Sequence, residues 1–149
     1  MPPTPVKLSK IVVPVDGSES SGRAARFAAD LAEKMGAKVT LLHVYDATGL
    51  VMLGVASLSK AQLEEAKANV SRETFEATKK AMGAAAFDAA EKVTAIGEAA
   101  EEIIEHAKKA KSDLVVMGCR GRSAMKQLLL GSVSQKVVSH APCGVTIVR

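Results

Sequence analysis

Short apolar runs alternate with longer segments of helical periodicity along this chain. The apolar runs are rich in β-branched residues and contain few polar side chains, which is typical of strands buried on both faces of a parallel sheet. A partly polar run at residues 90–95 predicts one further strand, and its polarity fits the edge of a sheet. The apolar runs themselves predict strands at residues 11–15, 38–45, 113–118 and 144–148.

Helical periodicity predicts four helices between these strands. The first begins after Ser18, a good N-cap residue, and ends at Gly36. Its apolar positions recur at helical spacing, so its buried face is expected to consist of Ala24, Phe27, Ala28, Leu31 and Met35. The other three helices are predicted at residues 61–85, 98–111 and 132–140.

The regular alternation of strands and helices predicts the fold class. Strand-helix-strand units of about this length are right-handed crossovers, which place the strands parallel. We therefore expect an α/β protein, a Rossmann-like, flavodoxin-sized open sheet of five parallel strands with helices on both faces. The 149 residues fit a single domain, 1–149, with residues 1–6 as a flexible lead-in. Residues 46–59 form either a mobile loop or an ordinary long connection.

Composition and charge narrow the classes of partner. Apolar residues make up 48% of the chain but aromatic ones only 3%, so platforms for stacking nucleic-acid bases are scarce. The net charge of +4 comes from bases scattered among acids, without a basic run, and we expect no nucleic-acid partner. No signal pattern is visible, and no apolar stretch reaches the roughly 18 residues of a membrane span. Two cysteines without a CxxC motif suggest reduced thiols, and the protein is expected to be cytoplasmic with no membrane partner.

Closely spaced glycines after the fourth predicted strand form a candidate phosphate cradle. Gly118 and Gly121 are followed after nine residues by Gly131 and Ser132, which open the last helix. Glycines let the backbone approach a phosphate, and a helix N-terminus adds amide donors and partial positive charge. The alternative is that these glycines only build a tight loop and a helix cap. Positive charge nearby comes from Arg120, Arg122 and Lys126.

Two other features of this region leave alternatives open. Ser132-Val133-Ser134-Gln135 has the form of a capping box, so the Ser132 hydroxyl could cap its own helix, bind a phosphate oxygen, or alternate between the two. Asp16 follows the first strand, where its carboxylate could meet a ribose hydroxyl or a metal ion, or could simply cap the turn before the helix.

Other catalytic motifs are missing from the sequence. There is no GxxxxGK[ST], and GxGxxG does not follow the first strand, so neither a P-loop motor nor a dinucleotide oxidoreductase is supported. His43, His106 and His140 stand singly and are expected to be structural. Cys119 lies beside the cradle, where Arg120 could stabilise its thiolate, but it has no matched histidine. No metal site made of side chains is predicted.

The glycine pattern resembles that of the nucleotide-binding branch of the universal stress protein family. The family pattern is G-2x-G-9x-G-(S/T), and this chain matches it without insertion. The resemblance extends from about residue 7 to the end of the chain. It is carried by Gly118, Gly121, Gly131 and Ser132 and by residues 11–18, 41–44, 97–98, 113–118 and 142–148.

The resemblance implies a sheet of order 3-2-1-4-5 and a homodimer formed through the last strand. It also implies that ATP or another adenine nucleotide binds at the carboxyl ends of the strands, with Mg²⁺ or Mn²⁺. Asp16 would face the ribose, Val44 the adenine, and Gly118 the ribose and phosphates. Carried over in the same way, Pro14 and Val15 would line the base pocket, and Gly121, Gly131, Ser132 and Val133 would hold the phosphates.

Three functional hypotheses follow. The first is an ATP-binding regulator of the stress response, with slow or no hydrolysis because no general base is evident near the cradle. The second is an enzyme: a weak ATPase, a nucleotidyl transferase or a protein that phosphorylates itself on Ser132 or Ser134. The third is a nucleotide-free interaction module, against which the intact glycine pattern argues. The sequence does not identify a regulatory protein partner.

Overall fold

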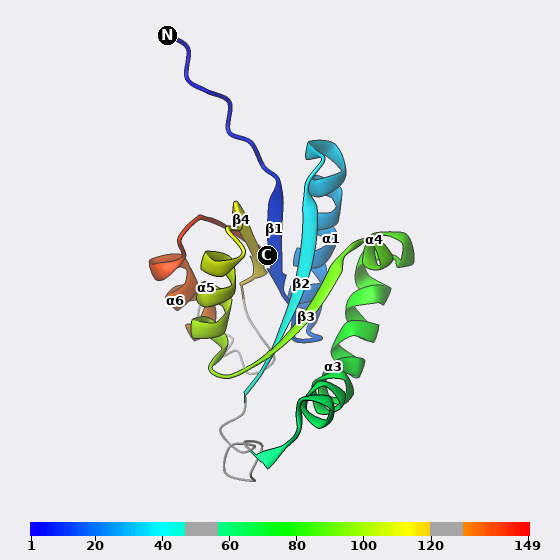
Figure 1. Cartoon of the computed structure of the whole chain (residues 1–149). Helices are drawn as coiled ribbons and strands as arrows, with labels where there is room; N and C mark the ends of the chain where they lie inside the picture. Colours follow the sequence, from blue (N-terminus) through cyan, green and yellow to red (C-terminus); the bar gives the residue numbers. More distant parts are fainter. Residues whose placement is uncertain (47–56, 120–129) are drawn as a thin grey trace.

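The computed structural model describes residues 1–46, 57–119 and 130–149 (Figure 1). Most of the predicted loop at residues 46–59 therefore lies outside the described residues. The same is true of Arg120, Gly121, Arg122 and Lys126.

Five parallel strands form one sheet, as the apolar runs predict. From one edge to the other the order is β3-β2-β1-β4-β5, which confirms the order that the family resemblance implies. The partly polar strand lies at an edge, as expected, and pairs only with β2. The strands are β1 (Lys10–Pro14), β2 (Lys38–Tyr45), β3 (Glu91–Ile96), β4 (Leu114–Gly118) and β5 (Gly144–Val148).

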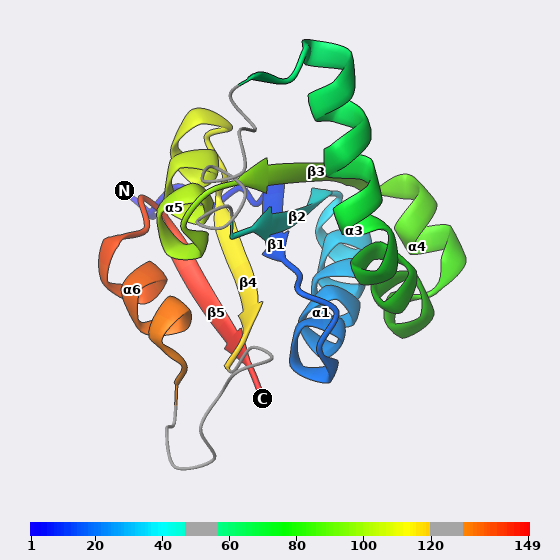
Figure 2. The ribbon, with the colours of Figure 1, turned by 90° about the horizontal axis from the view of Figure 1, so that it is seen from below.

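Helices cover both faces of this sheet (Figure 2). On one face α1 (Glu19–Met35), α3 (Lys60–Met82) and the short α4 (Ala84–Ala89) pack on a core built from alternate strand residues such as Val13 and Leu41. On the other face α5 (Ala99–Lys109) and α6 (Ser132–His140) pack on the intervening residues such as Val12 and Leu42. Within the described residues, no helix is long and apolar enough to cross a membrane.

The long helix predicted at residues 61–85 is divided in two. It starts one residue early because Ser59 and Gln62 form a capping box that the prediction missed. It ends at Met82, and Gly83 takes a φ of 95°, a conformation that side chains rarely adopt. α4 then begins directly after this glycine, so the prediction of one uninterrupted helix was wrong.

The inward face of α1 is narrower than its apolar pattern suggested. Ser18 caps the helix and Gly36 ends it with a φ of 68°, as predicted. The buried positions, however, are alanines together with Ser20, Ser21 and Gly22, while Phe27 is 44% exposed and Met35 50% exposed. A Cβ on Gly22 would lie 2.8 Å from the Ala81 Cβ, so α1 and α3 approach closely through small residues. Phe27 and Met35 are left at the flank of α1, and the prediction that they are buried was wrong, whereas Leu31 packs against the core as predicted.

Candidate functional site

The predicted site residues lie at the carboxyl edge of the sheet. β1, β2 and β4 are parallel, so their last residues, Pro14, Tyr45 and Gly118, meet at the same edge. The strand order reverses between β1 and β4, and the helices that follow these strands lie on opposite faces. β1 and β4 pair at Ile11 with Leu114 and at Val12 with Val115, well before the carboxyl ends of the two strands. In open α/β sheets such a reversal is the usual place for a ligand.

Asp16 organises the turn between β1 and α1. One of its carboxylate oxygens accepts a hydrogen bond of 2.9 Å from the Ser18 amide, while the Ser18 hydroxyl accepts one of 3.1 Å from the Ser21 amide. Gly17 between them has a φ of 83°. The structural role left open for Asp16, capping this turn, is confirmed. A contact with ribose stays a prediction.

Gly118 is enclosed by the first turn of α1. A Cβ at this position would lie 2.8 Å from the backbone carbonyl carbon of Ser20 and 2.9 Å from its Cβ, and closer still to its hydroxyl. Real Cβ atoms essentially never make non-bonded contacts this short, so only glycine allows α1 and β4 to pack as they do. The Ser20 hydroxyl is buried here, and no hydrogen-bond partner for it is found within the described residues.

The start of α6 is tied directly to the end of β4. The Gly131 amide donates to the Cys119 carbonyl over 2.8 Å. The Ser134 hydroxyl lies 3.1 Å from the Gly118 carbonyl oxygen and 3.4 Å from that of Cys119. The glycine at the end of the strand and the Gly-Ser pair that opens the helix are therefore neighbours in space, as the cradle requires.

The capping box predicted for α6 does not form. Gly131 is the N-cap, no side chain of a described residue caps the helix, and the Gln135 amide donates to the Gly131 carbonyl over 3.0 Å. The Gln135 side chain turns instead to the Leu130 carbonyl, at 3.2 Å. Ser132 is consequently the first helical residue and is exposed, while the amides of the first turn have no acceptor within their own helix.

The residues predicted to surround the base lie on two different faces of the sheet. Val15 is 3% exposed and belongs to the core under α1, and Pro14 is half-buried. Val44 packs at the edge of the other core, under α5 and α6. Val133 packs against that second core as well. Their contacts with a base or phosphate stay predictions.

The single histidine on β2 has a structural environment. His43 is 7% exposed, and its Nδ1 lies 2.8 Å from the Ser71 hydroxyl on α3. Ser71 is in turn 2.6 Å from the Thr94 hydroxyl on β3, and the Phe75 ring meets the imidazole edge-on. This network joins two strands and a helix. Sequence periodicity missed it, because Ser71 was not expected on the buried side of α3.

Charged side chains at the start of α5 interact with α6. The Glu98 carboxylate accepts hydrogen bonds from the amides of Glu101 at 2.7 Å and Ala100 at 3.3 Å. Lys136 of α6 lies 3.5 Å from Glu98 and also 3.5 Å from Glu101. The bond from the Glu101 amide, with smaller contributions from Ala100 and Lys136, lowers the pKa of Glu98. Lys136 is thus engaged by carboxylates at the flank of the cradle.

Burial is the largest cause of a shifted pKa in two other groups, away from the cradle. Desolvation raises the pKa of the Cys143 thiol, which keeps it protonated at neutral pH. Desolvation likewise lowers the pKa of His106. Among the described residues, no three His, Cys, Asp or Glu side chains are grouped as metal ligands.

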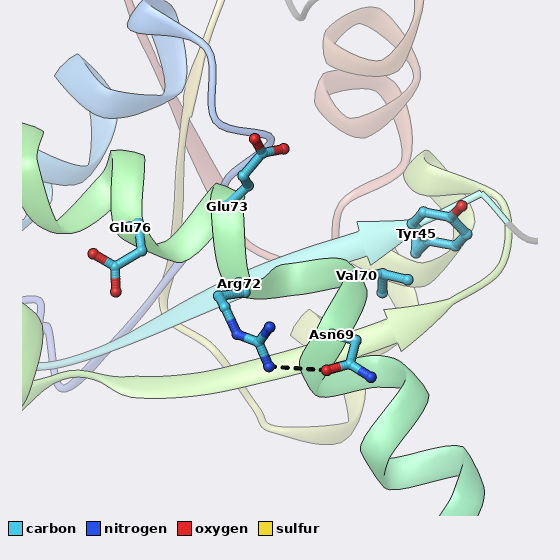
Figure 3. Close-up of a pocket in the computed structure, with 6 residues that line it drawn as sticks. All are labelled: Tyr45, Asn69, Val70, Arg72, Glu73 and Glu76. Carbon is cyan, nitrogen blue, oxygen red and sulfur yellow. Dashed lines mark hydrogen bonds between the residues drawn. The ribbon is translucent and has the colours of Figure 1, made fainter.

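A separate open pocket of about 550 Å³ lies beside the end of β2 (Figure 3). Apart from Tyr45, its walls come from α3, where Arg72 donates a 2.9 Å hydrogen bond to Asn69. Tyr45 and Val44 point to opposite faces because side chains alternate along a strand. The pocket therefore lies across the sheet from the predicted adenine position. Its walls are Tyr45, Asn69, Val70, Arg72, Glu73 and Glu76.

Comparison with known proteins agrees with this architecture. The model of the universal stress protein family matches residues 7–149, nearly the whole chain. The chain belongs to the universal stress protein family. Universal stress protein YxiE from Bacillus subtilis is 36% identical over 146 residues, which cover 95% of this chain and 99% of that protein.

Solved structures of the family share the fold. Universal stress protein UspA from Lactobacillus plantarum superposes with a TM-score of 0.72 at 25% identity, covering 97% of this chain and 100% of the other. A universal stress protein in complex with cAMP superposes with a TM-score of 0.65 at 26% identity, covering 97% and 98%. The five-stranded α/β fold of this chain is therefore the universal stress protein fold.

Proposed function

We propose that this protein is a nucleotide-dependent regulator of the stress response that binds ATP at the carboxyl edge of its sheet. The observation that carries the proposal is the junction of β4 and α6, where the Gly131 amide and the Ser134 hydroxyl hold the first turn of α6 against the end of β4. This arrangement brings a strand-end glycine and a helix N-terminus together, and such a pair suits a phosphate group.

The roles of the individual residues follow from their places at this edge. The exposed Ser132 hydroxyl and the amides of Ser132 and Val133 would bind phosphate oxygens, while Gly118 allows close approach. Asp16, in its turn after β1, would meet the ribose. Val44, with Pro14 and Val15, would border the adenine. We include Arg120, Gly121 and Arg122 in the proposed site on the basis of the glycine pattern alone.

The relative in complex with cAMP supports an adenine nucleotide as the ligand class. The proposal of ATP rests on the glycine pattern, which provides for more than one phosphate. A divalent cation, Mg²⁺ or Mn²⁺, would be held mainly by phosphate oxygens and water, as Mg²⁺ commonly is.

We propose slow or no hydrolysis, since the sequence places no general base near the cradle. Self-phosphorylation is the second candidate, and the structure separates its two possible acceptors. Ser132 is exposed at the start of α6, whereas Ser134 is 3% exposed with its hydroxyl against two carbonyls. If the protein modifies itself, Ser132 is the acceptor that we propose.

We further propose a cytoplasmic, single-domain protein that forms a homodimer through β5. The edge strand β5 reads Gly-Val-Thr-Ile-Val and carries no charge, while the opposite edge, β3, begins with Glu91 and Lys92. Uncharged edge strands tend to pair with another strand, and charged residues prevent such pairing. The difference between the two edges supports pairing at β5.

Calorimetric titration with ATP and Mg²⁺ tests the nucleotide site. Gly131 has a φ of −68°, which any residue can adopt, so Gly131→Val adds bulk at the cradle without backbone strain. We expect this variant to bind ATP more than about tenfold more weakly, a difference of about 1.4 kcal/mol. The matched control is Gly144→Val at the start of β5, among the amino ends of the strands, where the nearest described atom to a new Cβ is Leu114 Cδ1 at 3.4 Å. Equal affinities for both variants would refute the site.

A further inference from the structure

Ser134 makes contacts that its place in a helix does not explain. It lies in the first turn of α6, is 3% exposed, and directs its hydroxyl away from its own helix to the carbonyls of Gly118 and Cys119. A serine hydroxyl has one proton to donate, so the two distances of 3.1 and 3.4 Å describe one donor placed between two acceptors. The shorter contact, to Gly118, is the dominant one.

This hydroxyl works together with one backbone bond. The Gly131 amide donates to the Cys119 carbonyl at 2.8 Å, so both ends of the segment from Gly131 to Ser134 are fastened to the same strand end. Ser132 and Val133 lie between the two fastened points. Their amides therefore have a defined position relative to Gly118.

The chain connection alone would not set this position. Ten residues, 120–129, separate Cys119 from Leu130, and a connection of that length tolerates many distances between its ends. Val133 in the first turn and Val137 about one turn further along also pack α6 against the core, but these apolar contacts are not directed at the end of β4 as a hydrogen bond is. The direct bonds at Gly131 and Ser134 join the first turn to the end of β4.

We propose that Ser134 is a positioning residue of the phosphate site, which holds the Ser132 and Val133 amides at the correct distance from Gly118. The inference rests on the proposed function, because it assumes that these amides bind phosphate. Ser134 does not itself touch the nucleotide. It acts by preorganising donors, and donors fixed in advance lose less entropy when a ligand binds.

Comparison of ATP with adenosine separates this role from a general packing role. Ser134→Ala removes the hydroxyl and leaves a small side chain, and we expect its affinity for ATP to fall on the order of fivefold, the worth of one hydrogen bond. Adenosine has no phosphate, so its affinity should stay unchanged, as measured by NMR titration. Ser139→Ala, an exposed serine of the same helix, is the matched control and should bind both ligands like the wild type.

Amide hydrogen exchange in the free protein provides a second test that needs no nucleotide. We expect the Gly131 amide to exchange several-fold faster in Ser134→Ala and at the wild-type rate in Ser139→Ala. Equal losses of ATP and adenosine affinity, unchanged ATP affinity, or unchanged exchange at Gly131 would each overturn the inference. If the wild type bound no ATP, the proposed function would fail, and the exchange rates would still decide whether Ser134 holds the start of α6.

Discussion

Gly118 illustrates how a residue of the proposed ligand site can also be required for packing. On one side it admits the first turn of α1, where Ser20 leaves no space for a Cβ. On the other side its carbonyl accepts the bond from Ser134 that holds α6. The glycine is therefore required by the fold even before any nucleotide is considered. Loss of binding in a Gly118 variant would not by itself identify a phosphate contact.

This packing predicts that Gly118→Ala destabilises the protein in the absence of nucleotide. The added methyl group would overlap the Ser20 backbone, and we expect a loss of about 1–3 kcal/mol in the free energy of unfolding, typical of overpacking. Urea denaturation measures it. Gly144→Ala is the control, because its new Cβ would make an ordinary 3.4 Å contact with Leu114. Equal stability of the two variants would contradict the close packing of α1 on β4.

At the scale of the elements, the N-termini of the helices determine how the site is arranged. α1 begins at the Ser18 cap beside Asp16, α5 begins at Glu98, and α6 begins at Gly131. The first is capped by a hydroxyl and the second by a carboxylate. The third has no side-chain cap among the described residues, and its first-turn amides are the donors that we propose for a ligand. The same structural position thus stabilises two helices and supplies the proposed phosphate donors in the third.

The carboxylate cap of α5 predicts a stability effect that depends on pH. Because hydrogen bonds from the Glu101 and Ala100 amides and the charge of Lys136 lower the pKa of Glu98, its ionised form stabilises the folded state. This contribution is present at neutral pH and is lost as the pH falls through the range in which glutamates titrate, about pH 4. We expect Glu98→Ala to cost at most about 1 kcal/mol at pH 7, since the group is largely exposed.

Thermal unfolding of the wild type and Glu98→Ala between pH 7 and pH 3 measures this effect. The difference in stability between the two proteins should become smaller as the pH falls. Glu105→Ala is the control, as Glu105 lies on the same helix and pairs only across its exposed surface with Lys109, at 3.4 Å. If the difference in stability between the wild type and Glu98→Ala stayed constant across this pH range, that result would argue against a charged cap.

For the whole molecule, the two edges of the sheet differ in chemistry. β3 carries Glu91 and Lys92 at its start, and Lys92 also lies over the Phe87 ring, 4.5 Å from its centre. β5 carries no charge, and apolar side chains are exposed on helices of both faces, Phe27 on α1 and Val138 on α6. Such an edge suits association with a second copy, because an identical strand offers the same uncharged surface.

We therefore expect a charge on β5 to weaken the proposed homodimer. Thr146→Lys introduces an ammonium group in the middle of the edge strand, and its dimer dissociation constant should rise more than about tenfold, measured by sedimentation equilibrium. Lys92→Thr at the other edge is the control and should leave the wild-type dimer unchanged. A monomeric wild type, or a Thr146→Lys variant that dimerises as well as the wild type, would contradict dimerisation through β5.

Much of the fold could be predicted because it depends on local patterns. Apolar runs located the strands, and Ser18 and Gly36 marked both ends of α1. The errors arose where distant segments meet. Phe27 was expected to be buried, but the close approach of Gly22 to α3 turned small residues inward instead. Ser71 was not expected to be buried, since only its partners on β2 and β3 explain a polar residue there.

The amino-acid sequence by itself determined the fold class, the glycine pattern and the family, because these depend on residue types and their spacing. Only the tertiary structure decided what the cradle residues contact. It showed that Gly118 is needed for the packing of α1, and that Gly131 rather than Ser132 caps α6. It also placed Ser134 against the end of β4. The physical reason is that these contacts join residues far apart along the chain, and spacing cannot specify them.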